Sequence, residues 1–522
     1  MIPVLSGDEM RGADRRAIDD LGIPASDLME SAGRAVAEAL RARFPLTRRP
    51  LFLCGKGNNG GDGFVAARRL LDLAPRVLLV GPRSGVKGEA RARMEAFESA
   101  GGRVEVAETA GDWRHLMKDR ATDIIVDAIL GTGLREAPSG LACLAIADVV
   151  AWVAARQLPV VAVDVPSGLS SDSGTVPWES IRATLTVCLQ APKRCHALPA
   201  ASERCGEVWV VDIGIPRAVL AEAASRLAWI EASDVAALYP VRGPGSHKGT
   251  YGHLLVIAGS VGKTGAAVLA ATAALRSGVG LVTVATPSLA LPTVAAGRPE
   301  AMTEPLPATP EGTLSAEGVE RALALAAARS AVVIGPGIGA SDEVRRFVEA
   351  FVPRCPVPLL VDADGLNALA SSLGGAAVLL ARRSWPTVVT PHPGEMARLS
   401  GTTTAQVQDR RLEEAEAFAR ASGAVVVLKG HRTLVARPDG ECAVNPTGNP
   451  GLAKGGTGDV LAGMAGALLA RGNEAWSAAC AAVYLHGFAG DRAAERIGAE
   501  GLLAGDLSEE IPGALRSLVA HG

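Results

Sequence analysis

Short apolar runs alternate with longer mixed stretches in the first half of the chain. Five such runs end at or just before a glycine or an aspartate: 51–54, 76–80, 123–127, 159–164 and 207–212. Stretches rich in Ala, Arg and Leu lie between them and favour helices, for example 64–73 and 88–100. Strands that alternate with helices form a parallel sheet covered on both faces, with ligands at the carboxyl ends of the strands. We therefore predict a three-layer α/β/α fold.

A second series of the same kind fills the other half. A helix-like run at 217–228 and a proline- and glycine-rich segment at 243–249 interrupt the first series. The strands predicted after it lie at 253–258, 331–335, 358–362 and 424–428. A chain of 522 residues is too long for one hydrophobic core. We predict two α/β domains, 1–228 and 229–522.

Composition narrows the class of protein. Aromatic residues make up only 3% of the chain, so Ala, Val and Leu must build the cores. The net charge is -3 and no basic stripe stands out, which argues against nucleic acid as a partner. We expect a cytoplasmic homo-oligomer with no signal peptide and no membrane span. The eight scattered cysteines contain no CxxC pair, which predicts reduced thiols and no structural zinc.

The motif GKGNNGGDG at 55–63 follows the first predicted strand and precedes a helix. Its glycines let backbone amides approach a ligand closely, and the helix start adds positive charge, which suits a phosphate or pyrophosphate. Glycines alone fit an ordinary strand-to-helix turn equally well. The side chains of Asn58, Asn59 and Asp62 favour a functional site.

Two more polar loops follow strands of the same predicted sheet. Asp127 ends one strand and precedes GTGL at 131–134, and Asp164 ends the next in DVPSGL at 164–169. An aspartate just past a strand often only caps a loop or helix, and for either residue alone that is the better interpretation. Three polar loops at one edge of a sheet meet in space, however, as an active site requires.

These three motifs resemble the epimerase domain of the NAD(P)H-hydrate repair enzymes over roughly residues 5–215. The resemblance implies a Rossmann-like domain, with Asp164 beside the nicotinamide ring as a proton carrier. It implies a potassium ion held by Asn59, Asp127 and Ser167, whose oxygens are hard ligands. The implied substrate contacts are Asn58, Asn59, Gly60, Gly61, Asp62, Gly131, Thr132, Gly133, Leu134, Arg135, Glu136, Ala137 and Asp164.

The motif GGTGD at 455–459 opens an apolar helix in the second half. Its amides converge where an oxyanion or phosphate can lie. A negative Asp459 is unsuited to binding phosphate but suits a base that takes a proton from an attacking hydroxyl. Asp is also common at helix starts because of the helix dipole, and alone that interpretation would be preferred. The motif resembles the phosphate end of ribokinase-like small-molecule kinases.

Four further motifs narrow the resemblance: SHKGTYGH, GPGIG, DADGLN and TPHPGE occur in that order before GGTGD. Together they are similar to the NAD(P)H-hydrate dehydratase branch over roughly residues 230–515. The resemblance implies a ribokinase-like α/β domain. The implied nucleotide contacts are Lys429, Gly430, His431, Arg432, Thr433 and Gly458. The implied contacts to the hydrated cofactor are Ala266, Gly339, His392 and Asp459, although His392 could otherwise be an ordinary loop histidine.

The resemblance implies a bifunctional enzyme, an isomerase and a lyase. One activity interconverts the R and S forms of hydrated NADH or NADPH at C6, and the other dehydrates the S form with release of AMP and phosphate. ADP with Mg²⁺ is the predicted co-substrate, with ATP possible. Three alternatives stay open: a vitamin-precursor kinase in the second half, a nucleotide-binding regulatory module in the first, and a dehydrogenase. The dehydrogenase is the weakest of the three. We find no GxGxxG after the first strand that is followed, about twenty positions on, by the acidic residue of a dehydrogenase's cofactor site.

Overall fold

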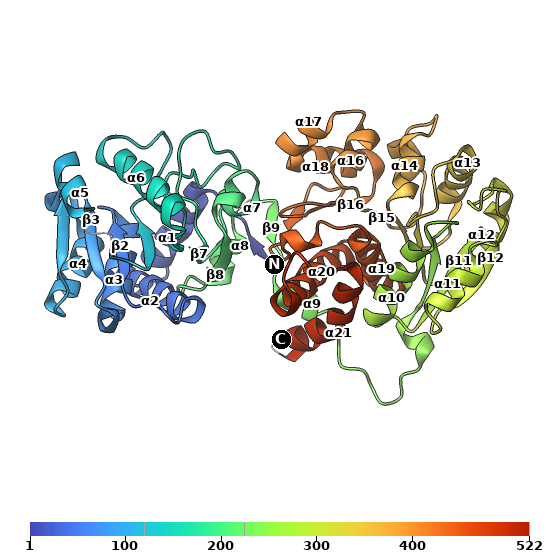
Figure 1. The fold of residues 1–522 in the computed structure, drawn as a ribbon, viewed down its shortest axis with the longest axis horizontal. Helices are drawn as coiled ribbons and strands as arrows, with labels where there is room; N and C mark the ends of the chain where they lie inside the picture. Colours follow the sequence, from blue (N-terminus) through green and yellow to red (C-terminus); the bar gives the residue numbers. More distant parts are fainter. Residues whose placement is uncertain (119–120, 224, 521–522) are drawn as a thin grey trace. The chain divides into compact units, whose positions relative to one another are not determined.

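The computed structural model describes residues 1–118, 121–223 and 225–520 (Figure 1). The chain forms two compact units. The first unit is Ile2–Ser225, and the second is Arg226–Gly522 together with Met1. The border predicted at residue 228 lies inside strand β9 (Leu227–Trp229), which belongs to the second unit.

The first unit is built on a parallel seven-stranded sheet in the order β4-β3-β2-β5-β6-β7-β8. Its strands are β2 (Pro50–Cys54), β3 (Arg76–Val80), β4 (Val104–Ala107), β5 (Ile124–Ala128), β6 (Val160–Val163), β7 (Leu185–Leu189) and β8 (Glu207–Val211). Its main helices are α1 (Gly7–Asp19), α2 (Ala25–Arg43), α3 (Asn58–Arg69), α4 (Gly88–Ser99), α5 (Ala110–Leu116) and α6 (Gly140–Arg156). Figure 1 shows helices on both faces of the sheet. Leu51 and Leu53 join the core under α5 and α6, while Phe52 is buried on the opposite side. The predicted α/β fold is confirmed.

Helix α3 begins earlier than the sequence predicted. Its first residue is Asn58, so most of the glycine motif is the first turns of a helix and not a loop. The glycines allow this helix to pack closely. A Cβ at Gly60 would lie 2.0 Å from the Gly55 carbonyl oxygen, and one at Gly63 would lie 2.8 Å from the Ala128 Cβ. Close packing within the fold is therefore as good a reason for glycine at these positions as close approach of a ligand.

The second unit contains a larger sheet. From β9 onward, the order of its strands is β9-β18-β17-β16-β15-β14-β13-β10-β11-β12. The strands from β12 to β16 along this order are parallel, and β17 runs antiparallel to its neighbours. Their bounds are β10 (His253–Ile257), β11 (Leu281–Pro287), β12 (Met302–Leu306), β13 (Ala331–Ile334), β14 (Leu359–Val361), β15 (Thr387–Val389), β16 (Val425–Leu428), β17 (Leu434–Ala436) and β18 (Cys442–Val444).

Alanine-rich helices pack tightly in the second unit. The helices of the main core are α10 (Thr264–Arg276), α19 (Thr457–Ala470), α20 (Ala475–Ile497) and α21 (Ala504–Ala520). The other helices of at least six residues are α11 (Leu291–Gly297), α12 (Val319–Ala327), α13 (Asp342–Phe351), α14 (Asp364–Ala370), α15 (Ala376–Ala381), α16 (Pro393–Ser400), α17 (Thr404–Asp409) and α18 (Arg411–Ser422). A Cβ at Gly463 would lie 2.1 Å from the Ala270 carbonyl oxygen, so α19 and α10 touch backbone to backbone.

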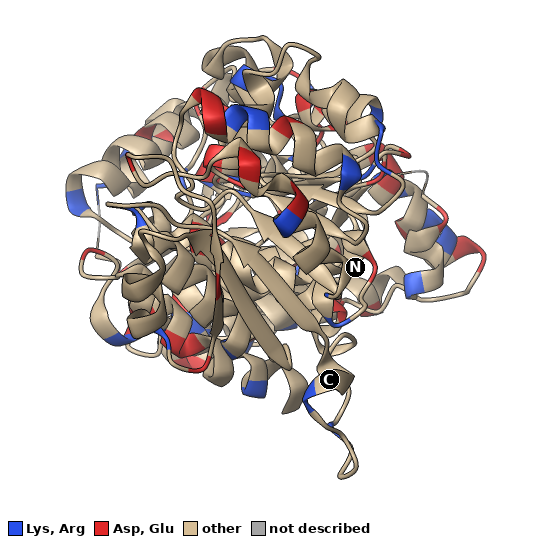
Figure 2. Cartoon of the chain, turned by 90° about the vertical axis from the view of Figure 1, so that its right-hand side faces the viewer, with Lys and Arg blue, Asp and Glu red and all other residues tan. Residues whose placement is uncertain are grey.

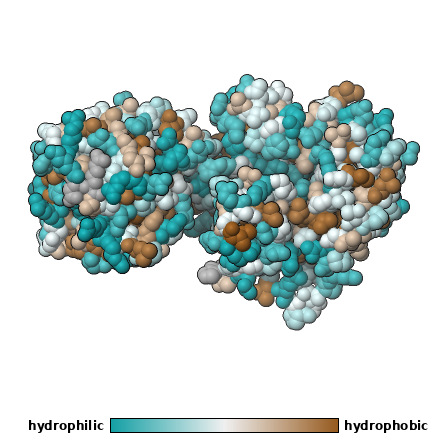
Figure 3. Space-filling model, viewed as in Figure 1, coloured by the Kyte–Doolittle hydropathy of each residue, from teal (hydrophilic) through white to brown (hydrophobic). Residues whose placement is uncertain are grey.

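Surface features are unremarkable in both units. Basic and acidic residues are mixed over the elements in view in Figure 2, and apolar side chains are scattered among polar ones in Figure 3. Within the described ranges, no helix is long and apolar enough to cross a membrane. All eight cysteines are free thiols, and only Cys143 is exposed.

Candidate active sites

The first site lies where three adjacent strands of the seven-stranded sheet end. Strands β2, β5 and β6 are neighbours, and the candidate residues follow them or end them. The Asn59 side-chain amide donates to the Leu130 carbonyl at 3.0 Å. Ser167 donates to the Asp127 carboxylate from its backbone N–H at 2.7 Å and from its hydroxyl at 2.5 Å. The three polar segments singled out in the sequence therefore meet at one edge of the sheet.

Asp127 is a fully buried carboxylate whose partners are neutral. Besides Ser167, the Ile129 N–H donates to it at 3.3 Å. Burial raises the pKa of Asp127 to about 6, although the hydrogen bonds from Ser167 lower it. No Lys or Arg in the described part of the chain pairs with this carboxylate. A bound cation would stabilise its ionised form. The Ser167 hydroxyl lies against both this carboxylate and the Leu130 carbonyl, which in turn accepts from Asn59.

Asp164 follows β6 with a left-handed backbone at φ +61°. Such a conformation is costly for a residue other than glycine and is frequent at functional sites. Its Oδ1 accepts hydrogen bonds from the Leu189 N–H at 3.0 Å and from Lys193 Nζ. Among the residues that the structure describes, no hydrogen bond reaches Oδ2. That oxygen is available to a ligand.

Two charged residues near Asp164 were missed in the sequence analysis. Lys193 is fully buried, and Asp14 lies on α1. Burial raises the pKa of Asp14 to about 6. Burial, with added repulsion from Asp164 and Asp14, raises the pKa of Asp62 well above its usual range. Nothing in the spacing of Lys193 or Asp14 marks them, because their neighbours come from other elements of the fold.

The loop over 131–137 lies largely at the surface. Gly131 packs against Asn59, since a Cβ there would lie 3.1 Å from the Asn59 Cγ. The Thr132 carbonyl accepts from Arg11 at 3.3 Å. Thr132 and Leu134 are half-buried, and the exposed members are Gly133, Arg135, Glu136 and Ala137. The loop can therefore contact a ligand without rearrangement of the core.

The second site lies at the carboxyl ends of β13, β14, β15 and β16, which are neighbours in the larger sheet. Asp362 Oδ1 accepts from the Thr390 hydroxyl at 2.7 Å and from Lys429 Nζ at 2.8 Å. Gly458 faces this pair: a Cβ there would lie 3.6 Å from Lys429 Nζ and 3.9 Å from Asp362 Oδ2. Burial lowers the pKa of Lys429, but the carboxylates of Asp362 and Glu395 raise it above its usual value. A charged lysine therefore lies opposite the start of α19.

Asp459 is the third residue of α19. Burial, followed by repulsion from Asp362, raises the pKa of Asp459 to about 7, although Lys429 lowers it. A carboxylate that titrates near neutral pH is well matched to accepting a proton from a hydroxyl group. The arrangement joins a base, a lysine and a helix N-terminus in one place.

The loops around GPGIG and DADGLN are tied together. The Gly339 N–H donates to Asp364 Oδ2 at 2.9 Å, and Lys263 pairs with the same oxygen at 2.9 Å. A Cβ at Gly337 would lie 2.9 Å from the Ala266 Cβ, so Ala266 lies directly beneath this loop. The predicted contact Ala266 therefore packs against the loop that also carries Gly339.

His392 is the N-cap of α16, and its ring is half exposed. Its Nδ1 accepts from the Gly394 N–H at 3.0 Å, and its Nε2 lies 3.4 Å from Glu395 Oε1. Burial lowers the pKa of His392. The ring thus has a structural task, as the ordinary loop interpretation expects, and it also keeps an exposed edge for a ligand.

Only some residues of the segment 429–433 can face the site. Gly430 has φ +141° and packs on the buried Arg411, since a Cβ there would lie 3.1 Å from two guanidinium nitrogens. The Arg432 side chain is buried, stacks 4.9 Å from the Trp229 ring centroid and donates to the Pro446 carbonyl at 2.7 Å. The remaining members are the exposed His431 and the half-buried Thr433. The Arg432 guanidinium is thus already engaged by Trp229 and the Pro446 carbonyl.

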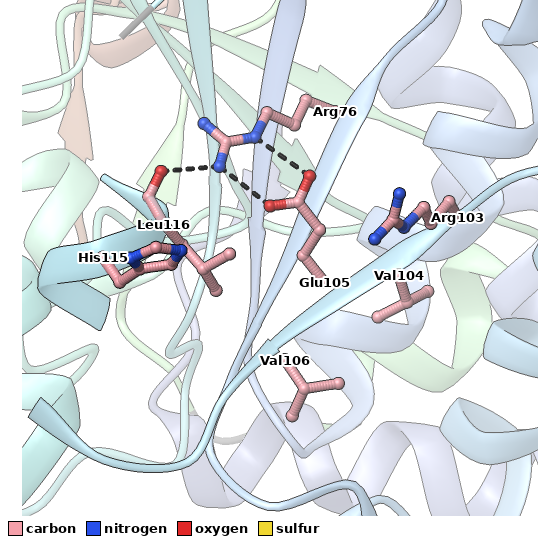
Figure 4. Close-up of a pocket in the computed structure, with 7 residues that line it drawn as sticks. All are labelled: Arg76, Arg103, Val104, Glu105, Val106, His115 and Leu116. Atoms are coloured by element: carbon pink, nitrogen blue, oxygen red, sulfur yellow. Dashed lines mark hydrogen bonds and ion pairs between the residues drawn. The ribbon is translucent and has the colours of Figure 1, made fainter. Parts of the chain in front are cut away.

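An open cavity of about 440 Å³ lies elsewhere, beside the edge strand β4 (Figure 4). Its lining includes Arg103, His115 and an ion pair in which Arg76 Nη2 donates to Glu105 Oε2 at 2.8 Å. None of the candidate site residues lines it.

Comparison with known proteins shows the family to which the chain belongs. A family model described as NAD(P)H-hydrate dehydratase matches residues 254–513, and one described as YjeF-related protein N-terminus matches residues 25–195. The bifunctional NAD(P)H-hydrate repair enzyme Nnr of Moorella thermoacetica is 41% identical over 98% of this chain and 96% of its own length. The chain belongs to the family of bifunctional NAD(P)H-hydrate repair enzymes. The Escherichia coli relative of the same name is 36% identical over 96% of this chain and 91% of its own length.

Membership in this family makes the chain an enzyme that repairs hydrated NADH and NADPH, an isomerase and a lyase in one polypeptide. The function predicted from the sequence is confirmed, and the vitamin-precursor kinase is not favoured. Among solved structures, the ADP/ATP-dependent NAD(P)H-hydrate dehydratase of Bacillus subtilis, co-crystallised with ATP/Mg²⁺, is 35% identical with a TM-score of 0.48. That similarity covers 56% of this chain and 98% of the Bacillus protein.

Proposed function

We propose that the two activities are divided between the two units. The first unit epimerises hydrated NADH and NADPH at C6, and the second dehydrates the S form with a nucleotide. The grouping of Asp127, Ser167 and Asp164 at one sheet edge supports the first assignment. The grouping of Lys429, Gly458 and Asp459 at another supports the second. Fragments separated between Ser225 and Arg226 test this division, because the first should epimerise without nucleotide.

In the first site, Asp164 exchanges a proton with the C6 hydroxyl. Protonation of the hydroxyl lets water leave while the ring nitrogen donates its lone pair to form an N1–C6 double bond. Water then adds to the opposite face of C6, a proton passes to a carboxylate, and the electron pair returns to nitrogen. One proton is consumed when water leaves and one is released when water adds, so the protons balance over each epimerisation. The substrate contacts would be the residues of 58–62 and 131–137.

A potassium ion fits the residues around Asp127. The buried carboxylate lacks a basic partner in the described ranges, the Ser167 hydroxyl is bonded to it, and Asn59 binds the nearby Leu130 carbonyl. Such an ion would neutralise the carboxylate and fix the ends of β5 and β6 against the glycine motif. Replacement of potassium by sodium in the epimerase assay tests the assignment.

In the second site, Asp459 takes the proton from the C6 hydroxyl as that oxygen attacks the terminal phosphorus of ADP. AMP leaves, and the new phosphate ester turns a poor leaving group into a good one. The ring nitrogen then expels phosphate, and loss of the C5 proton restores the dihydropyridine. Lys429 and the amides at Gly458 stabilise charge on the transferring oxygens. Gly339, His392 and Ala266 would line the hydrated ring.

ADP is the proposed co-substrate, together with Mg²⁺, and ATP remains an alternative that a product assay distinguishes: AMP forms from ADP and ADP from ATP. Lys429 and its loop through Thr433 would hold the nucleotide phosphates. The seven buried free thiols support a location in the reducing cytoplasm. The homo-oligomer predicted from the sequence stays a prediction.

A further inference from the structure

Lys193 stands out because it is a charged side chain with no exposed surface. Its ammonium group donates to Asp164 Oδ1 and, at 2.9 Å, to the Leu189 carbonyl, and it lies 3.9 Å from the Cys188 sulfur. An ammonium has three N–H donors, and here all three have partners inside the fold. Asp164 is its only ion-pair partner in the described ranges.

Fold stability alone does not explain such a pair. Taking two charges out of water is costly, and well-packed apolar residues often replace a buried ion pair without loss of stability. Asp164, whose carboxylate Lys193 holds, is also one of six non-glycine residues in the described ranges with a positive φ, here +61°. Strain of this kind persists where the surroundings fix a residue for a function.

The two carboxylate oxygens of Asp164 differ in their contacts. Oδ1 takes the Lys193 ammonium and the Leu189 N–H, at 3.0 Å for the latter. Oδ2 takes no hydrogen bond from the described residues. The carboxylate therefore cannot rotate without losing both bonds, and one oxygen stays directed away from them.

We propose that Lys193 is the positioning residue of the epimerase site, which fixes the Asp164 side chain through Oδ1 and leaves Oδ2 to exchange the proton with the hydrated ring. This inference rests on the proposed role of Asp164. Lys193 does not touch the substrate and acts only through Asp164.

The charges around the pair agree with this role. Asp14 faces it from α1 and Asp62 from α3, while the thiols of Cys188 and Cys195 approach Lys193 from β7 and the following segment. Burial raises the pKa of both Asp14 and Asp62. Lys193 donates to Asp164 and to neither of these, so of the three carboxyl groups only that of Asp164 is held by the ammonium.

The test compares Lys193→Met, which removes the charge, with Lys193→Gln, which keeps a hydrogen-bond donor. Epimerase kcat and KM are measured between pH 5 and pH 9, and nucleotide-dependent dehydration of the S form serves as an internal control in the same protein. We expect both variants to lose up to about a hundredfold in epimerase kcat, the loss that a misplaced reacting group can cause, with Met losing more. KM should change little at any pH, because Lys193 contacts Asp164 Oδ1 and not the substrate.

Arg76→Met is the matched control. It breaks the half-buried ion pair with Glu105 that Figure 4 shows. This pair joins β3 and β4, which the strands β2 and β5 separate from β6 and Asp164 in the sheet order. It should lower the thermal stability of the first unit and leave epimerase kcat unchanged.

The outcomes distinguish a failure of the Lys193 role from a failure of the proposed role of Asp164. A folded Lys193→Met or Lys193→Gln protein with wild-type epimerase kcat, or one that changes only KM, overturns the positioning role. Unfolding of both variants, with folding restored by adding Asp164→Asn, makes Lys193 a folding determinant and also overturns it. If Asp164→Asn alone keeps full epimerase activity, the proposed function of Asp164 itself fails.

Discussion

Replacement of Asp459 by asparagine separates a catalytic base from a helix-capping residue. Asn keeps the size and hydrogen bonding of the side chain but removes its basicity. Loss of a positioned base costs about 100- to 10,000-fold in rate, equivalent to roughly 3 to 5 kcal/mol in the barrier. We expect dehydration of the S form to slow by at least about a hundredfold, while ADP still binds and epimerisation in the first unit is unaffected.

The same substitution should change stability in the opposite direction. Burial and Asp362 raise the pKa of Asp459 from 3.8 to about 7, so the fold disfavours its ionised form. That shift corresponds to at most roughly 4 kcal/mol of stability, lost progressively as pH rises from about 4 to about 7. Asn carries no charge and escapes this loss. The variant should therefore be more stable than the wild type at pH 8 and no more stable at pH 4.

The assay follows recovery of NADH absorbance from purified S epimer with ADP, alongside thermal unfolding at both pH values. A residue that served only the helix dipole would behave in the opposite way: Asn would cost about 0.3 to 1 kcal/mol of stability and leave the rate intact. A stable Asp459→Asn protein with near-normal dehydration refutes the reasoning, and the reaction would then need another base.

Three further predictions concern both sites. Dehydratase kcat/KM should fall tenfold per pH unit below about 7 as Asp459 becomes protonated, and a flat profile down to pH 5 would contradict that assignment. Gly430→Ala, at φ +141° and 3.1 Å from Arg411, should raise the KM for ADP several-fold with little change in kcat, as measured by initial rates; an unchanged KM would show that the 429–433 loop does not hold the nucleotide. Asp127→Ala should abolish epimerisation, or at least its dependence on potassium, and leave S-epimer dehydration intact; wild-type activity in potassium-free buffer would remove the cation from the scheme.

Strand–helix alternation predicted the architecture because buried parallel strands leave plain apolar runs. The strands that it missed include the three-residue β17 and β18, β12, which contains Glu304 and Pro305, and also β7 and β11, which have five and seven residues. Run length alone does not explain these misses, because the three-residue β14 lies within the predicted strand 358–362. The start of α3 was placed too late because glycines are poor helix formers in isolation, whereas close packing on Gly55 and Ala128 favours them here.

The candidate sites were predicted as far as their motifs are local. Asp127, Asp164 and Asp459 each stand next to glycine-rich turns that mark them in the sequence. Lys193, Asp14 and Arg411 carry no such mark. Each is an isolated charged residue in an ordinary segment, and its importance comes from groups that the fold brings to it from other strands and helices. Only the three-dimensional structure shows those neighbours.

One measurement tests the central claim most directly: the yield of NADH from an equimolar mixture of R and S hydrated NADH, incubated with the whole protein and ADP. The account predicts complete recovery in a single fast phase with ADP, none without nucleotide, and rapid recovery of only the S half by Asp164→Asn. Recovery by the wild type that stops at half, or that proceeds without any nucleotide, would contradict it.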